Sequence, residues 1–303
     1  MVCEPLASAS VAPVRVVIVH WNQPTWLADT IRALAQQQGE LRVVVVDNGS
    51  TPAARAELAN VVASAPLPVD HVMLTRNTGF GPGANAGLRY WLEHDDLEWA
   101  VVMPHDALPA PGTIPRLVAM ATAREHAGLA CADVGDGESP VVDPYFGGMT
   151  VPARTTEGWE RVDYPHGTLM LLRRDCVEEI GLFDERYFAY CEEADLGLRA
   201  RDAGWEVGLG RGVMVRNPTM RSGSPAVDYL MHRNTLLLVR EHSGRYHAFI
   251  RCLIAVWQTG RGLVQPSSRA WLYDARGRVW GMIDFLRGRF GPPPDRLFTS
   301  PPN

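Results

Sequence analysis

The chain has 303 residues, of which 46% are hydrophobic, and its formal net charge is −5. This length and composition suit one large α/β domain with a helical addition. The acidic balance gives no indication of nucleic-acid binding, and we expect no nucleic-acid partner. No lysine is present, which excludes a P-loop, because that motif needs its lysine on the phosphates.

The five cysteines form no CxxC pair and no zinc-like spacing with histidine. Scattered cysteines in a chain of this size indicate free thiols in a reducing compartment, so we expect a cytoplasmic protein. The N-terminus lacks the apolar stretch of a signal peptide, and no run of about 18 apolar residues is present. We therefore expect a loose tail over residues 1–13 and no membrane-spanning segment.

The first half of the chain alternates apolar runs with helical patterns. The spacing of Leu27, Ile31 and Leu34 predicts a helix over residues 24–38, and a second helix follows over 84–94. The alternation predicts a doubly wound, mostly parallel sheet, whose ligand binds beyond the carboxyl ends of the strands. The apolar runs predict buried strands over residues 15–19, 41–46, 72–75 and 99–103.

The second half has a different character. Residues 128–165 are rich in Gly, Pro and Asp, and we interpret them as loops and short antiparallel strands near an acceptor site. Short helices are expected over residues 175–180 and within 187–204. The composition changes near Ser222–Pro225, which divides the chain into a main domain and a helical region. The expected divisions are 14–225 for the main domain, 226–290 for the helical region and 291–303 for a proline-rich tail without fixed structure.

The helical region is strongly basic. Between Arg240 and Arg289 nine arginines stand against three acids, interleaved with tryptophan and leucine. Basic amphipathic helices with aromatic residues are typical of membrane surfaces, which favours peripheral contact with the inner face of the membrane. The same residues also fit packing on the main domain or a homodimer interface, and the sequence leaves these interpretations open.

Three strand ends are followed by residues that could bind a ligand or a cation. Asp47 can accept hydrogen bonds from a base or ribose, although Asp-Asn-Gly-Ser is also a good turn. Gly79–Ala84 follows the third strand rather than the first, so it fits a loop that approaches a ligand better than a dinucleotide fingerprint. Asp106 could hold a divalent cation on a diphosphate, or cap a helix.

Glu192 and Glu193 form the densest acidic cluster, and aromatic residues flank it. Desolvation and like-charge crowding raise a carboxyl pKa and make a better general base. The alternative is a solvated first turn of a helix, where acids favour the helix dipole. Asp195 lies four residues before Arg199, and an ordinary helix ion pair explains it equally well.

Eight segments, in this order and spacing, make the chain resemble the inverting family-two glycosyltransferases, especially the bacterial rhamnosyltransferase-like branch. The match runs from about residue 14 to residue 242. The segments are Val-His-Trp-Asn22, Val-Asp47-Asn-Gly-Ser, Arg76-Asn77-Thr-Gly-Phe-Gly, Ala84-Asn85-Ala-Gly, Pro-His-Asp106-Ala, Gly181-Leu-Phe-Asp-Glu, Phe188-Ala-Tyr-Cys-Glu-Glu-Ala-Asp-Leu and His232-Arg233-Asn234.

The resemblance implies a GT-A fold and a role for each matching residue. Glu193 matches the general base, with Glu192 as the next candidate, and Asp106 matches the last acid of a metal motif for Mg²⁺ or Mn²⁺. The chain departs from the family's metal motif at Pro104 and Asn217, which stand where many relatives carry metal-binding residues. The positions expected to bind the nucleotide-sugar are Asn22, Asp47, Arg76, Asn77, Gly79, Asn85, His105, His232 and Arg233.

The implied reaction transfers a sugar, rhamnose or another deoxysugar or hexose, from a dTDP- or UDP-sugar to an acceptor hydroxyl with inversion. The acceptor would be a glycan, a lipid-linked molecule or a small molecule. Pro104 suggests one alternative, a catalytically impaired protein that only binds sugar nucleotides. A dehydrogenase is disfavoured by the position of the glycine-rich loop. A nucleotidyltransferase is disfavoured because no glycine-rich basic loop follows the first strand.

Overall fold

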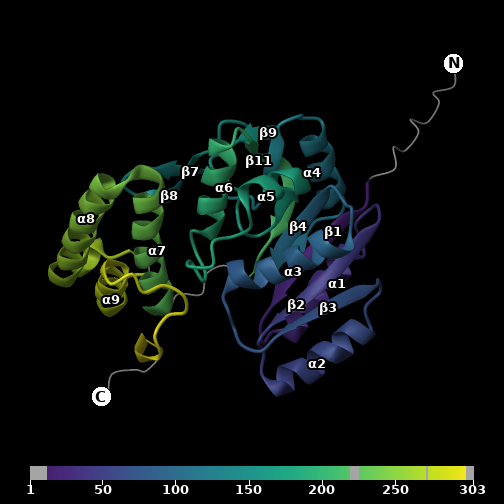
Figure 1. Cartoon of the computed structure of the whole chain (residues 1–303), viewed down its shortest axis with the longest axis horizontal. Coiled ribbons are helices and arrows are strands. Elements are labelled where there is room, and N and C mark those ends of the chain that lie inside the picture. The colour runs from purple at the N-terminus through teal and green to yellow at the C-terminus, as the bar shows by residue number, and fades with distance from the viewer. Residues whose placement is uncertain (1–11, 219–224, 271, 298–303) are drawn as a thin grey trace.

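The computed structural model of the chain describes residues 12–218, 225–270 and 272–297 and has a central sheet at its core (Figure 1). The strand order is β3-β2-β1-β4-β10-β6-β11-β5, with β9 paired to β11. The strands are β1 (Val14–His20), β2 (Leu41–Asn48), β3 (Val69–Leu74), β4 (Trp99–Pro104), β5 (Leu108–Pro109), β6 (Ala127–Asp133), β9 (Gly158–Arg161), β10 (Met170–Arg173) and β11 (Glu206–Arg216).

The half of the sheet that the apolar runs predicted is parallel. β1 pairs in parallel with β2 and β4, and β2 with β3, whereas β10 runs antiparallel to its neighbours β4 and β6. Side chains of β1 alternate between the two faces: Val16 and Ile18 join one apolar core, Val17 and Val19 the other. The β-branched run is therefore buried on both faces, as expected of a doubly wound sheet.

Helices cover both faces. One core receives side chains of α1 (Pro24–Leu34), α2 (Pro52–Ala63) and α4 (Thr113–Thr122). The opposite core receives side chains of α3 (Phe80–His94), α5 (Arg174–Ile180) and α6 (Glu192–Asp202). The fold class predicted from the sequence is confirmed.

A separate group of helices packs beside the sheet domain, at the left of Figure 1. It consists of α7 (Pro225–Ser243), α8 (Arg245–Val264) and α9 (Ala275–Leu286), with short 3₁₀ turns at Pro266–Ser268 and Asp295–Leu297. Tyr187 and Ala194 of the main domain join its apolar core, which ties the two parts together. None of the described helices has the length and hydrophobicity needed to cross a bilayer.

Two expectations need correction. Residues 128–165 are not only loops and short antiparallel strands, because β6 is a fully buried strand parallel to β11 in the middle of the sheet; β7 (Glu138–Asp143) and β8 (Gly147–Pro152) do form an antiparallel hairpin. The tail after Gly291 is not loose throughout, because Leu297 is buried against α7. Residues 1–11 of the predicted tail over residues 1–13, and the boundary near Ser222, lie outside the described residues.

Candidate active site

Two adjoining cavities open where β1, β2 and β4 end. The smaller one, here called the acidic cavity, has a volume of about 330 Å³, and Asp106, Glu192 and Glu193 line it. The other, here called the large cavity, has a volume of about 600 Å³ and includes Asn77 and Gly79. They form one cleft at the carboxyl edge of the parallel strands, where the sequence predicted the ligand. Their shared wall consists of Phe80, Pro104, His105, Ala189 and Tyr190.

Glu192 and Glu193 begin α6 and face the acidic cavity. Glu192 is buried and Glu193 half-buried, and the Oε2 atom of each has no hydrogen-bond partner among the described residues. Burial, and then the charge of Glu193, raises the pKa of Glu192 well above its ordinary value. Burial also raises the pKa of Glu193, but a hydrogen bond from Glu192 opposes the shift. Of the two carboxyls, Glu192 is therefore the one that favours the protonated form.

The loop before these carboxyls has a strained backbone. Phe188, Tyr190 and Cys191 have φ values of 64°, 70° and 72°, in the left-handed region that non-glycine residues rarely adopt. The Asn234 side chain on α7 donates hydrogen bonds to three carbonyls of this loop, those of Tyr187, Ala189 and Tyr190, at 2.8, 2.8 and 2.9 Å. Such strain persists only where surrounding contacts over-determine the conformation, and it clusters at functional sites.

Asp106 follows β4 and lies in the wall of the acidic cavity. It is buried, and its Oδ1 accepts a hydrogen bond from the Asn217 amide at 3.3 Å. Within residues 12–218, 225–270 and 272–297, no group of three His, Cys, Asp or Glu side chains could hold a metal ion. Mg²⁺ is usually held by one or two carboxylates together with substrate phosphates. Asp106 therefore fits a cation that a bound diphosphate also coordinates.

His105 lines both cavities beside Asp106. Its Nδ1 lies 3.2 Å from the Val19 carbonyl oxygen, and burial lowers its pKa. Its ring meets the buried His20 ring edge-on, and burial, followed by His105, lowers the pKa of His20 to about 4. Both imidazoles are therefore neutral near pH 7, so His105 offers the cleft a polar ring without a fixed charge.

The large cavity is built on the loop after β3. The Asn48 amide donates to the Gly79 carbonyl at 2.8 Å, and its oxygen accepts from the Thr78 backbone nitrogen at 3.0 Å. Asn77 also braces the loop, because its oxygen accepts from the Gly79 nitrogen at 2.9 Å. Gly79 has a φ of 99°, and a Cβ there would lie 2.0 Å from the Phe188 carbonyl oxygen, so only glycine fits.

Three of the predicted residues brace loops instead of lining either cavity. The Asp47 carboxylate is fully buried and pairs with Arg55 at 2.7 Å. Although burial opposes it, hydrogen bonding by Ser50 and Arg55 keeps the pKa of Asp47 low. The Asn22 oxygen accepts from the Thr51 backbone nitrogen at 2.8 Å. The Asn85 amide binds both backbone groups of Phe183.

The other three predicted residues also lie outside the cavity walls. Arg76 is exposed. His232 is buried, and its Nδ1 pairs with Asp228 at 3.0 Å. Arg233 is completely buried, and its Nε donates to the Asn234 oxygen at 3.0 Å. That contact fixes the orientation of the Asn234 amide. Arg233, which belongs to the helical region, therefore supports the strained loop indirectly.

Several lining residues were not among the predicted site residues. In the acidic cavity these are His166, Gly167 and Thr168, which lie between the stretch 128–165 and β10. In the large cavity they include Trp21, which is 47% exposed, and Asn48. Trp21 and Asn48 belong to the same motifs as the predicted residues Asn22 and Asp47. The sequence does not indicate which residue of each neighbouring pair faces the cleft.

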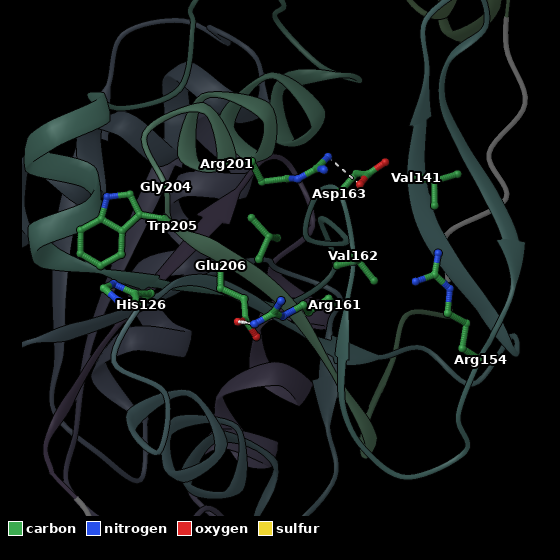
Figure 2. A pocket seen from close by; sticks show the side chains of 11 residues that line it. His126, Val141, Arg154, Arg161, Val162, Asp163, Arg201, Gly204, Trp205 and Glu206 are labelled. Carbon is green, nitrogen blue, oxygen red and sulfur yellow. Dashed lines mark ion pairs between the residues drawn. The ribbon is translucent and has the colours of Figure 1, made fainter.

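Another depression, of about 530 Å³, lies at the other end of α6 (Figure 2). Its lining includes Arg161 and Arg201, but these cations are already paired, with Glu206 at 2.5 Å and Asp163 at 2.6 Å. None of the predicted site residues lines it. The acidic and large cavities are therefore the better candidate site.

Comparisons with known proteins identify the family of the chain. A family model described as "Glycosyltransferase like family 2" matches residues 12–235. The N-acetylglucosaminyl-diphospho-decaprenol L-rhamnosyltransferase of Mycobacterium tuberculosis is 26% identical over 250 residues, which cover 69% of this chain and 78% of that protein.

Solved structures share the fold at low identity. The mannosyltransferase PcManGT from Pyrobaculum calidifontis, in complex with GDP-Man and Mn²⁺, aligns with a TM-score of 0.62 at 16% identity, covering 95% of this chain and 92% of that one. GalNAc-T7 with UDP, GalNAc and Mn²⁺ aligns with a TM-score of 0.63 at 15% identity, covering 92% and 57%. The chain therefore belongs to the family-two glycosyltransferases, with a GT-A fold, and is a nucleotide-sugar-dependent enzyme.

Proposed function

We propose that the protein transfers a hexose or deoxyhexose, such as rhamnose, from a dTDP- or UDP-sugar to an acceptor hydroxyl with inversion. The observation that carries this proposal is the Glu192–Glu193 pair, which shares the acidic cavity with Asp106. The rhamnosyltransferase of M. tuberculosis supports the sugar, and its name describes a lipid-linked acceptor. We therefore favour a lipid-linked glycan over a free small molecule as the acceptor.

The proposed reaction is a single displacement. Glu193 accepts the proton of the acceptor hydroxyl while the acceptor oxygen forms a bond to the anomeric carbon. The bond between that carbon and the diphosphate oxygen breaks at the same time, and the nucleoside diphosphate leaves with the electron pair. Attack from the face opposite the leaving group inverts the anomeric configuration. Glu193 then returns its proton to solvent.

The large cavity is proposed to hold the nucleotide-sugar through Asn77 and Gly79, with His105 at the wall shared with the acidic cavity. The other residues predicted for this role are proposed to act through the loops and helices that they brace or adjoin. They are Asn22, Asp47, Arg76, Asn85, His232 and Arg233. A divalent cation bound through Asp106, Mg²⁺ or Mn²⁺, would offset charge on the departing diphosphate.

A thermal-shift screen over UDP-, dTDP- and GDP-sugars tests the donor. A ligand that binds only the folded state at 100 times its Kd stabilises the protein by about 2.7 kcal/mol. We expect a rise in Tm with a dTDP- or UDP-sugar, followed by release of the nucleoside diphosphate when acceptor is added. If a donor stabilises the protein but no transfer or hydrolysis follows with any acceptor, the binding-only alternative is correct.

Replacing Asp106 with asparagine should weaken the dependence of donor binding on Mn²⁺. The Asp106 carboxylate in the acidic cavity suits a hard cation, and asparagine keeps the shape of the side chain while removing its charge. The measurement is the shift in Tm caused by UDP, with and without Mn²⁺, in both proteins. An equal enhancement by Mn²⁺ in wild type and variant, or full wild-type activity in excess EDTA, would contradict a cation at Asp106.

A further inference from the structure

α8 has an outward face made of large apolar side chains. Seven of these side chains have exposed fractions between 52% and 88%, and we call them the α8 outer face. They are Tyr246, Phe249, Leu253, Val256, Trp257, Leu263 and Val264. At 3.6 residues per turn they lie along one side of the helix, together with Gly260. In Figure 1 the helix lies at the edge of the molecule, on the side of the helical region away from the sheet.

The face that α8 turns toward the protein consists largely of small residues. Ala248, Ala255, Thr259 and Gly262 are buried there. A Cβ at Gly262 would lie 2.3 Å from the Tyr273 ring, which shows how closely the helix is packed. An ordinary surface helix buries its large apolar side chains and exposes its polar ones. α8 does the reverse, so folding alone does not account for the large side chains on its outer face.

The charged side chains of the segment that carries the α8 outer face are all arginines. Arg245 and Arg261 lie at its margins by helical spacing, and Arg269 donates a hydrogen bond to the Gly262 carbonyl near the end of the helix. No acidic residue occurs between Arg245 and Tyr273. The Arg261 guanidinium lies 5.3 Å from the centre of the Trp257 ring. Two copies of this face would bring cations together without a carboxylate to pair with them, whereas an anionic bilayer complements the face.

We propose that the α8 outer face inserts into the headgroup region of an anionic membrane, with the helix axis in the plane of the bilayer. A helix with apolar and aromatic side chains on one face and flanking arginines binds in this way. Tryptophan is enriched at this depth of the bilayer. This inference goes beyond the proposed transfer reaction, because membrane binding is measured without turnover.

The test is co-sedimentation of the full chain with vesicles of phosphatidylcholine, with or without phosphatidylglycerol. We expect sedimentation with the phosphatidylglycerol vesicles at low salt and release at high salt, because the headgroup attraction is screened. The double variant Phe249→Glu, Trp257→Glu should lose sedimentation. Met73→Glu is the matched control, because Met73 is 62% exposed but lies on β3, and it should sediment as wild type does. Arg245→Gln and Arg261→Gln should each weaken binding by about fivefold.

Three results would overturn this inference. The wild-type protein could remain in the supernatant with anionic vesicles at low salt. The double variant could sediment as well as wild type while its thermal unfolding is unchanged. Wild type could form a dimer that the double variant disrupts, without binding vesicles, which would assign the face to a second copy. A transfer assay with a water-soluble acceptor separates these results from a failure of the proposed reaction, because the double variant should match wild type there.

Discussion

Replacing Glu193 with glutamine should reduce kcat by about 10²- to 10⁴-fold, the usual contribution of a general base. Glutamine keeps the size of the side chain but cannot take up the proton of the acceptor hydroxyl. Donor binding should survive, because the large cavity and its loop are unchanged. The measurements are the rate of transfer under donor saturation and the shift in Tm caused by donor.

Glu192→Gln is the matched control. The structure favours a proton on Glu192, which then donates a hydrogen bond to the Glu193 carboxylate. A glutamine amide at position 192 can also donate that hydrogen bond, so this variant should keep most of its activity. The opposite pattern, with Glu193→Gln active and Glu192→Gln inactive, would make Glu192 the base.

The pH dependence gives a second measurement of the same pair. Burial raises the pKa of Glu193, and the proton must leave before this carboxyl can act as a base. The rate should therefore rise with pH through an apparent pKa above about 4.3, the ordinary value for glutamate. That acid limb should disappear in Glu193→Gln. A wild-type profile whose acid limb lies at or below the ordinary value would argue that the base is a solvated carboxylate.

The sheet was predictable where strands carry β-branched side chains on both faces. The apolar runs located β1, β2 and β4 to within about two residues, because a two-sided core demands such a pattern. β11 was not predicted, since glycines interrupt it at Gly208, Gly210 and Gly212. A Cβ at Gly208 would lie 2.0 Å from the Trp159 ring. Packing against this side chain, which is distant in the sequence, therefore requires glycine at position 208, and that glycine interrupts the apolar pattern of the strand.

The sequence predicted the position of the candidate site better than it predicted which side chains line it. Polar clusters at strand ends located the cleft, and Asn77, Gly79, His105, Asp106, Glu192 and Glu193 line it. Adjacent residues of a strand point to opposite sides, so a pattern cannot tell which of two polar neighbours faces the ligand. At the end of β2 the Asp47 carboxylate turns to Arg55, a partner eight residues away that the motif did not indicate.

The backbone that presents Glu193 should depend on Asn234. Left-handed φ values cost about 1–3 kcal/mol each at non-glycine residues, and three such residues lie within Phe188–Cys191. The Asn234 amide nitrogen holds the carbonyls of Tyr187, Ala189 and Tyr190 from one side, and the backbone of Gly79 packs against Phe188 from another. The Glu192–Glu193 pair follows directly, so its position relative to the cleft is set by these contacts.

Asn234→Asp should therefore reduce kcat by about 10²-fold, as misplacement of a reacting group by about 1 Å does. Aspartate keeps the volume and the acceptor for Arg233, but it replaces the donor with a negative charge that faces carbonyl oxygens. The KM for donor should change little. The acid limb of the pH profile should move to lower pH, because a displaced loop lets water reach the Glu193 carboxyl and so removes the burial that raises its pKa. A residue with only a structural role would leave that limb in place.

Thr259→Val provides the control for a general loss of stability. Thr259 is also buried in the helical region and donates a hydrogen bond to the Ala255 carbonyl at 2.7 Å. A typical intramolecular hydrogen bond contributes about 0.5–1.5 kcal/mol to stability, so the Tm should fall in both variants. Only Asn234→Asp should lose kcat and shift the pH profile at temperatures where both proteins are folded. If Asn234→Asp keeps a wild-type kcat and pH profile there, the loop keeps its conformation without Asn234, and the positioning role is wrong.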